Sequence, residues 1–109
     1  MNFYPHHIGD FRSATIHLSR LARSIYRDLI DIYYDTEQPL PDDEAHICWL
    51  VCAKTKQEKD AVTTVLRTFY VRTTGVLRNS RCDEEIAKYQ AKRDQARAAV
   101  ASRKDRKMP

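Results

Sequence analysis

The sequence predicts a mainly α-helical domain with a small β-hairpin, arranged like a winged helix-turn-helix and followed by a long C-terminal helix. Most of the 109 residues lie in segments whose apolar side chains recur every three or four positions, as in amphipathic helices. Residues 69–79 instead hold two β-prone runs around a glycine, which is typical of a hairpin. The whole chain has only two glycines, too few for the many tight turns of a sandwich or barrel.

The first residues are expected to form an arm and a short helix. Residues 2–8 are predicted to be an extended arm or edge strand, because Pro5 cannot donate a hydrogen bond to a neighbouring strand. Asp10 is expected to cap a short helix that runs through Ile16.

The first long helix is predicted from Ser19, as its cap, to about Tyr34. The proline-rich residues 38–41 then end it and form a rigid connection. One apolar stripe follows from the three- and four-residue spacing of Leu18, Leu21, Ala22, Ile25, Tyr26, Leu29, Ile32 and Tyr33.

A second helix is expected to be capped by Asp42 or Asp43 and to extend to about Ala53. Trp49 and Leu50 make this helix apolar almost all round, so we expect it to be buried between neighbours. Core packing is accordingly the expected role of the large aromatic residues Tyr26, Tyr33, Trp49 and Tyr70.

A third helix is predicted to begin at Thr55. Thr55 and Glu58 have the spacing of a capping box, in which each side chain accepts a hydrogen bond from the other residue's backbone amide. The inward positions are Ala61, Val62, Val65, Leu66 and Phe69, and the outward ones are Lys56, Lys59, Asp60, Thr63 and Arg67.

The hairpin is expected to turn at residues 73–75, between the β-prone runs 69–72 and 76–79. Asp83 is predicted to cap the last helix. The apolar positions of this helix become sparse after Tyr89, so its distal part is expected to project, to pair with a second chain as a homodimer, or to fray. The sequence thus divides into a winged-helix-like domain at 1–90 and a basic helical extension or tail at 91–109.

Several classes of protein are disfavoured by what the sequence lacks. No apolar run is long enough to span a membrane, and no signal peptide is visible. An odd number of cysteines without paired spacing indicates a reducing compartment, the cytoplasm. The sequence shows neither a phosphate-binding glycine loop nor a nucleophile motif, so we expect no catalysis and no cofactor. A metal site is a minor alternative, with the ligand set His46, Cys48, Cys52 and Cys82.

The charge of the chain is strongly segregated. Seven acidic and no basic residues lie between Asp28 and Glu44, whereas Lys54–Arg81 has seven basic residues against two acidic ones. A second basic segment starts at Ile86, with eight basic residues against two acidic ones. Because long cations on a rigid surface bind phosphates, the third helix and hairpin form the candidate DNA-binding surface. Its expected contact residues are Lys54, Lys56, Lys59, Thr63, Thr64, Arg67, Arg72 and Arg78. A solvated basic surface without a partner is the alternative.

Several motifs in order also resemble a known family. They are YPHHIGDF at 4–11, YRDLIDIYY at 26–34, TEQPLPDD at 36–43 and RNSRCDEEI at 78–86. They are similar to YdaU-like domains, which lie at the N-termini of prophage replication-initiation (replisome-organiser) proteins. The chain differs at Ser24, where family members usually have glycine, and at Val76, where many have an aromatic residue.

Surface and resemblance together predict a DNA-binding module of phage or prophage origin that acts in replication initiation by binding, without catalysis. The resemblance implies a helicase or helicase loader as protein partner. Two alternatives stay open: a protein–protein adaptor that docks a replication or host protein, and a small winged-helix transcriptional regulator. A DNA-binding module or regulator requires an affinity for DNA that falls steeply with salt concentration, whereas an adaptor does not.

Overall fold

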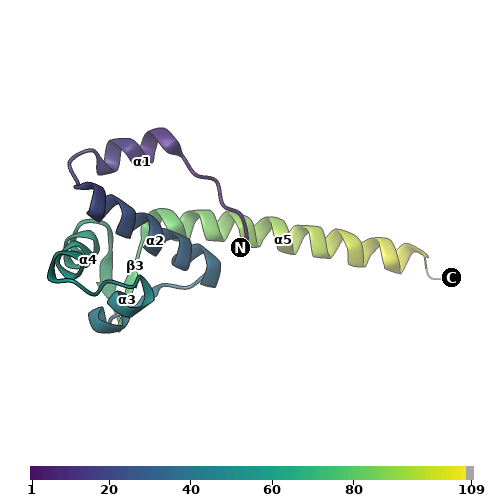
Figure 1. Cartoon of the computed structure of the whole chain (residues 1–109). Coiled ribbons are helices and arrows are strands. Elements are labelled where there is room, and N and C mark those ends of the chain that lie inside the picture. Colours follow the sequence, from purple (N-terminus) through teal and green to yellow (C-terminus); the bar gives the residue numbers. More distant parts are fainter. Residues whose placement is uncertain (108–109) are drawn as a thin grey trace.

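Over residues 1–107, the part of the chain that the structure describes, the computed structural model has five helices and a three-stranded antiparallel sheet. The elements follow in the order α1 (Ile8–Thr15), α2 (Arg20–Thr36), β1 (Leu40–Pro41), α3 (Glu44–Leu50), α4 (Lys56–Phe69), β2 (Val71–Thr73), β3 (Val76–Arg78) and α5 (Ser80–Lys107). α2, α3, α4 and the strands gather into one body, from which α5 projects (Figure 1). The predicted fold class, a mainly helical winged helix-turn-helix-like domain with a long C-terminal helix, is confirmed.

The core lies between α2 and the elements that pack on it, mainly α4 and α5. Leu29 and Tyr33 of α2 are completely buried, as are Val62 and Val65 of α4. Ser19 caps α2 as predicted, because its side chain accepts a hydrogen bond from the Ala22 amide at 3.1 Å. The helix extends to Thr36, slightly beyond the predicted Tyr34, and ends where Glu37 turns left-handed with φ 54°.

The predicted hairpin is confirmed, and the sheet has a third strand that the sequence did not indicate. β2 and β3 are joined through Thr74 and Gly75, which both have positive φ, as the tight turns of hairpins require. β1 pairs with the other edge of β3, so that Leu40 lies opposite Leu77. The segment 38–41 was expected to be only a connection. Its two-residue strand is stabilised by pairing with residues more than 30 positions away.

Asn79 caps the start of α5, four residues before the predicted cap Asp83. Its side chain accepts a hydrogen bond from the Cys82 amide at 3.1 Å and donates one to the hydroxyl of Tyr26 at 3.3 Å. The hydroxyl of Tyr33 in turn accepts from the Asn79 amide and donates to Asp83 at 2.5 Å. Asparagine and aspartate are equally good caps, so the sequence did not show which of the two begins the helix.

The second predicted helix is shorter and more exposed than expected. α3 ends at Leu50 rather than near Ala53, because Cys52 adopts a left-handed conformation with φ 58°. Asp43 is its cap, accepting from the His46 amide at 3.1 Å. The expected core role of Trp49 is wrong, since 73% of its surface is exposed. Ile47 and Cys48 occupy the only buried side of this seven-residue helix, and Trp49 points away from it.

The N-terminal arm is extended, but it does not join the sheet. Tyr4 stacks on Tyr34 of α2 with 4.2 Å between ring centroids, and the N-terminal ammonium lies 3.3 Å from the Glu37 carboxylate. α1 begins at Ile8, before the expected cap Asp10, and has no side-chain cap. Asp10 instead forms an ion pair with Arg81 of α5 at 2.8 Å. The N-terminal segment is therefore held against the rest of the protein by contacts of the arm with α2 and of α1 with α5.

α5 leaves the body of the protein about halfway along its length. Its buried residues Cys82 and Ile86 face the core, and its last contacts with the body run from Gln90 and Arg93 to Glu37. The helix is unbroken at the expected division between 90 and 91, and the last two residues of the expected extension lie outside the described part. None of the described helices is long and apolar enough to cross a membrane.

Candidate nucleic-acid interface

α4, the helix expected to contact DNA, is fixed at its N-terminus by the predicted capping box. The Thr55 side chain accepts a hydrogen bond from the Glu58 amide at 3.1 Å, and the Glu58 carboxylate accepts from the Thr55 amide at 3.0 Å. Glu58 also accepts from the Lys54 amide at 3.3 Å. These hydrogen bonds lower the pKa of Glu58, and the one donated by the Thr55 backbone has the largest effect. The start of α4 is thus fixed to the two residues that precede it.

Replacing Thr55 with alanine is expected to lower the free energy of unfolding at pH 7 by about 1 kcal/mol, the usual cost of a lost cap. Because folding lowers the pKa of Glu58, its contribution is present above its ordinary pKa of 4.5 and is lost as the pH falls through the folded value. Glu58→Gln removes the titrating carboxylate and should therefore flatten the loss of stability below pH 4.5. Urea denaturation at several pH values measures both effects, and an unchanged pH profile would contradict the role assigned to Glu58.

The outward face of α4 has cations that the body of the protein does not neutralise. Lys56, Lys59 and Arg67 are exposed on this helix, and Lys54 is exposed just before it. Among the side chains that the structure describes, those of residues 1–104, none of these four forms an ion pair. Asp60 lies on the same outward stripe as Lys56 and Arg67, because these positions are four and seven residues apart. Three of the four cations therefore lie toward the N-terminal end of the helix, and Arg67 lies beyond an acidic residue.

The two threonines of the expected surface already use their hydroxyl groups within the protein. Thr63 donates to the Glu44 carboxylate of α3 and approaches the carbonyl of Lys59 at 3.2 Å. Thr64 donates to the carbonyl of Asp60 at 3.1 Å. Each hydroxyl must give up its internal acceptor before it can donate to a phosphate.

The two arginines of the hairpin are likewise paired with acidic residues. Arg72 lies 2.6 Å from Asp42, and Arg78 lies 3.4 Å from Asp83. Both arginines are at least half exposed, and exposed ion pairs of this kind contribute little to stability. An incoming phosphate can therefore compete for each of them. Sequence reasoning missed these pairs because their partners belong to other parts of the fold.

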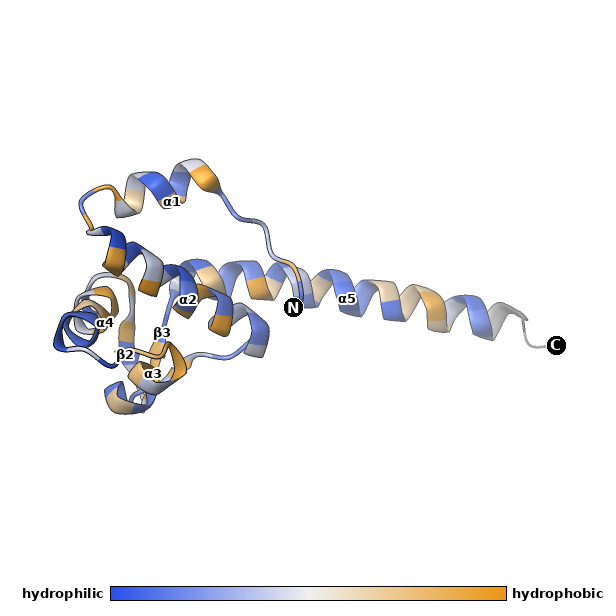
Figure 2. Cartoon of the chain, viewed as in Figure 1, coloured by the Kyte–Doolittle hydropathy of each residue, from blue (hydrophilic) through white to orange (hydrophobic). Residues whose placement is uncertain are grey.

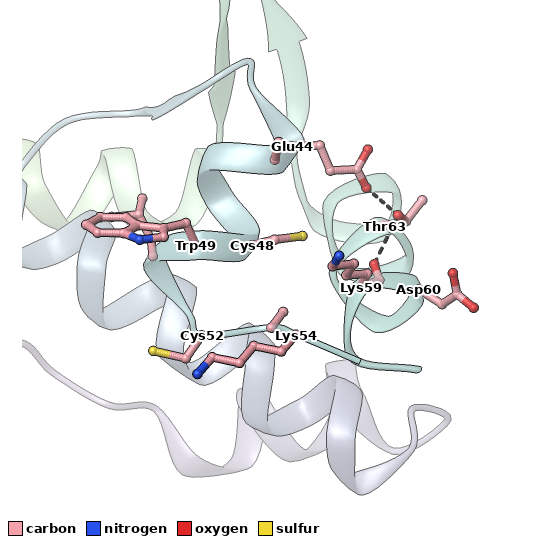
Figure 3. Close-up of a pocket in the computed structure, with 11 residues that line it drawn as sticks. Glu44, Cys48, Trp49, Cys52, Lys54, Lys59, Asp60 and Thr63 are labelled. Carbon is pink, nitrogen blue, oxygen red and sulfur yellow. Dashed lines mark hydrogen bonds between the residues drawn. The ribbon is translucent and has the colours of Figure 1, made fainter. Parts of the chain in front are cut away.

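A pocket of about 930 Å³ lies between α3 and α4, beside the candidate surface (Figure 3). Ala45, Cys48, Leu50 and Ala53 supply apolar parts of its wall, and Trp49 lines it as well. The charged residues around it are Glu44, Lys54, Lys59 and Asp60. The exposed Trp49 ring stacks on His46 with 5.7 Å between centroids. Sequence reasoning did not anticipate this pocket, because it predicted that Trp49 would be covered.

The cysteines proposed as a minor metal alternative are distributed over two regions. Cys48 and Cys52 line the pocket, whereas Cys82 is buried near the start of α5. Burial raises the pKa of the Cys82 thiol to about 11. Across the described residues, no three His, Cys, Asp or Glu side chains gather closely enough to hold a metal ion.

Comparison with known proteins gives a family for this chain. No curated protein and no solved structure matches it. Residues 2–87 match the family DUF1376, which is described as a protein of unknown function. The match begins in the N-terminal arm and ends in the first turns of α5, and so includes α3, α4 and the hairpin. Since it covers well over half of the sequence, the chain belongs to the DUF1376 family.

Proposed function

We propose that this protein binds DNA through the outward face of α4, with the hairpin contacting the adjacent backbone. The observation that carries the proposal is the set of exposed cations Lys54, Lys56, Lys59 and Arg67, which have no ion-pair partner among the described residues. Lys56, Lys59 and Arg67 belong to a helix whose opposite face is buried against α2 and whose start, next to Lys54, is capped. A rigid helix with uncompensated cations suits the major groove, where phosphates flank both sides.

Binding on this surface requires no covalent chemistry. The cations of α4 neutralise phosphates and release condensed counterions. Arg72 and Arg78, whose own side chains are exposed, exchange their partly buried carboxylate partners, Asp42 and Asp83, for phosphates of the neighbouring backbone. The acidic residues near α4 repel DNA that approaches in other orientations, which restricts how the duplex can lie on the protein.

The biological setting that we propose is DNA replication of a phage or prophage in the cytoplasm of the host cell. It is supported by the resemblance of four motifs to YdaU-like domains of replication-initiation proteins. In that setting the bound chain recruits a helicase or helicase loader. A transcriptional regulator would use the same α4 surface, and it would differ by preferring one short palindromic site.

The test of the proposed function is the salt dependence of DNA binding. With four α4-region cations and two hairpin arginines on phosphates, log affinity for a duplex should fall against log salt with a slope of at least about 5. Fluorescence anisotropy of a labelled duplex, measured over a series of salt concentrations, gives this slope. A chain with no measurable affinity for duplex or single-stranded DNA at low salt would contradict the proposal.

Protein docking is a second candidate function, and the exposed Trp49 favours it. Tryptophan is enriched among residues that dominate protein interfaces, and here it borders an apolar pocket. Because Trp49 is the only tryptophan in the chain, its fluorescence reports on this pocket alone. Adding purified replicative helicase or its loader should shift the Trp49 emission to shorter wavelength, and a Trp49→Ala variant should bind that partner at least tenfold more weakly. A partner that binds with no emission change would exclude this pocket as its docking site.

A further inference from the structure

The projecting part of α5 has all its described cations on one face. Successive residues of a helix are rotated by about 100°, so the five cations fall within a sector of about 140°. They are Lys92, Arg93, Arg97, Arg103 and Lys104. The opposite face has Asp94, Gln95, Ala98 and Ser102. The cations of this segment therefore form one positively charged face of the helix.

The body of the protein leaves this cationic face open. Every side chain from Asp94 to Lys104 is exposed, and only Arg93 reaches back to Glu37, at 3.8 Å. The other four cations have no ion-pair partner within the described residues. Figure 2 shows the projecting helix as mainly hydrophilic with scattered apolar positions. An extended, uncompensated positive surface attracts an anionic partner.

The apolar side chains of this face are too few to explain the helix by hydrophobic docking. Only Tyr89, Ala96 and Val100 lie between the cations. A second copy of α5 would bring like charges together across this thin stripe, which disfavours a homodimer through the helix. A membrane surface requires a broad apolar face that sinks into the headgroups, and three such residues do not form one. The charge pattern favours a hydrophilic polyanion.

We propose that the cationic face of α5, residues 92–104, binds the phosphate backbone of a DNA duplex as a second contact surface. Residues 92 and 104 are separated by about 18 Å along the helix axis, a length over which duplex DNA has about ten phosphates. Each of the five cations can thus meet its own phosphate. The small side chains of Ala96 and Ala99 allow the helix to lie close to the backbone. The inference shares its ligand with the proposed function but none of its residues, so each can fail alone.

The sharpest test moves charges without changing the composition. In a swap variant, Arg97→Ala is combined with Ala98→Arg, and Arg103→Ser with Ser102→Arg. Two cations then leave the face while net charge, length and amino-acid content stay the same. If each makes one phosphate contact, the salt slope of duplex binding falls by about 1.8, which corresponds to about 60-fold weaker binding at 0.1 M salt. Replacing Arg97 and Arg103 with lysine keeps the charges in place and should preserve both values.

Three outcomes overturn the inference. One is a swap variant that binds duplex DNA with unchanged affinity and slope; if α4 variants do weaken binding, the proposed function still stands. Another is tighter binding of the full chain to phosphatidylglycerol-containing vesicles than to duplex DNA at equal salt, which assigns the face to membranes. The third is a dimer in light scattering that the swap dissociates. Circular dichroism, expected to be unchanged, verifies that the swap keeps α5 helical.

Discussion

With Lys56, Lys59 and Arg67 all replaced by alanine, the chain is expected to bind duplex DNA about 500-fold more weakly at 0.1 M salt. Each cation that neutralises a phosphate contributes about 0.9 to the slope of log affinity against log salt. Loss of three contacts therefore lowers the slope by about 2.7. Because 0.1 M salt lies one logarithmic unit below 1 M, the affinity gained between these two concentrations is smaller by about 2.7 logarithmic units in the variant. Anisotropy of a labelled duplex over a salt series measures the affinity and the slope together.

The controls for this variant come from the same helix. Gln57→Ala and Thr68→Ala alter exposed, uncharged positions of α4 and should leave DNA binding unchanged. Asp60→Asn removes the acidic residue from the outward stripe and should strengthen binding. All these side chains are exposed, so each change should alter the free energy of unfolding by no more than about 0.5 kcal/mol. A folded triple variant with full affinity and slope would show that α4 is not the binding surface.

The features that the sequence predicted correctly are determined by residues that are close together in the chain. The caps at Ser19 and Thr55 involve residues at most three positions apart, and the hairpin turn requires the positive φ that Gly75 tolerates. Local spacing determines such features, so the helices and the hairpin could be located before the structure was known. Their order along the chain was sufficient to indicate the winged helix-turn-helix-like arrangement.

What the sequence did not predict depends on residues that meet only in the folded chain. β1 exists because Leu40 pairs with Leu77, and Arg72 is neutralised because Asp42 lies beside it. Asp42 belongs to the acidic segment 28–44, which is separate in the sequence from the basic segment that contains Arg72. Trp49 shows the same limit, because an apolar helix does not reveal which of its sides lacks a neighbour. Half of the candidate contact residues consequently already have a hydrogen-bond or ion-pair partner within the protein. They are Thr63, Thr64, Arg72 and Arg78.

Removal of the Asn79 side chain is expected to be the most damaging single polar change in the fold. Asn79 is only 3% exposed, and Asn79→Ala leaves the Cys82 amide and the Tyr26 hydroxyl without their partner. A buried polar group that loses its partner costs about 1–3 kcal/mol, and the loss of a helix cap adds to that cost. We expect the free energy of unfolding to fall by about 2–4 kcal/mol. Urea denaturation with an unchanged slope would show that the loss is one of stability alone.

Two tyrosines supply a matched pair that tests the same network. Tyr33→Phe removes the hydroxyl that accepts from the Asn79 amide and donates to Asp83, and it should cost about 2 kcal/mol. The hydroxyl of Tyr70 lies buried beside Asn79 without a hydrogen bond of normal geometry, and burial raises its pKa. Tyr70→Phe removes the same atom but breaks no such bond, so it should change stability by less than about 0.5 kcal/mol. Equally small losses in the two variants would mean that burial of the rings, and not the hydrogen bonds through Asn79, connects the hairpin and α5 to α2.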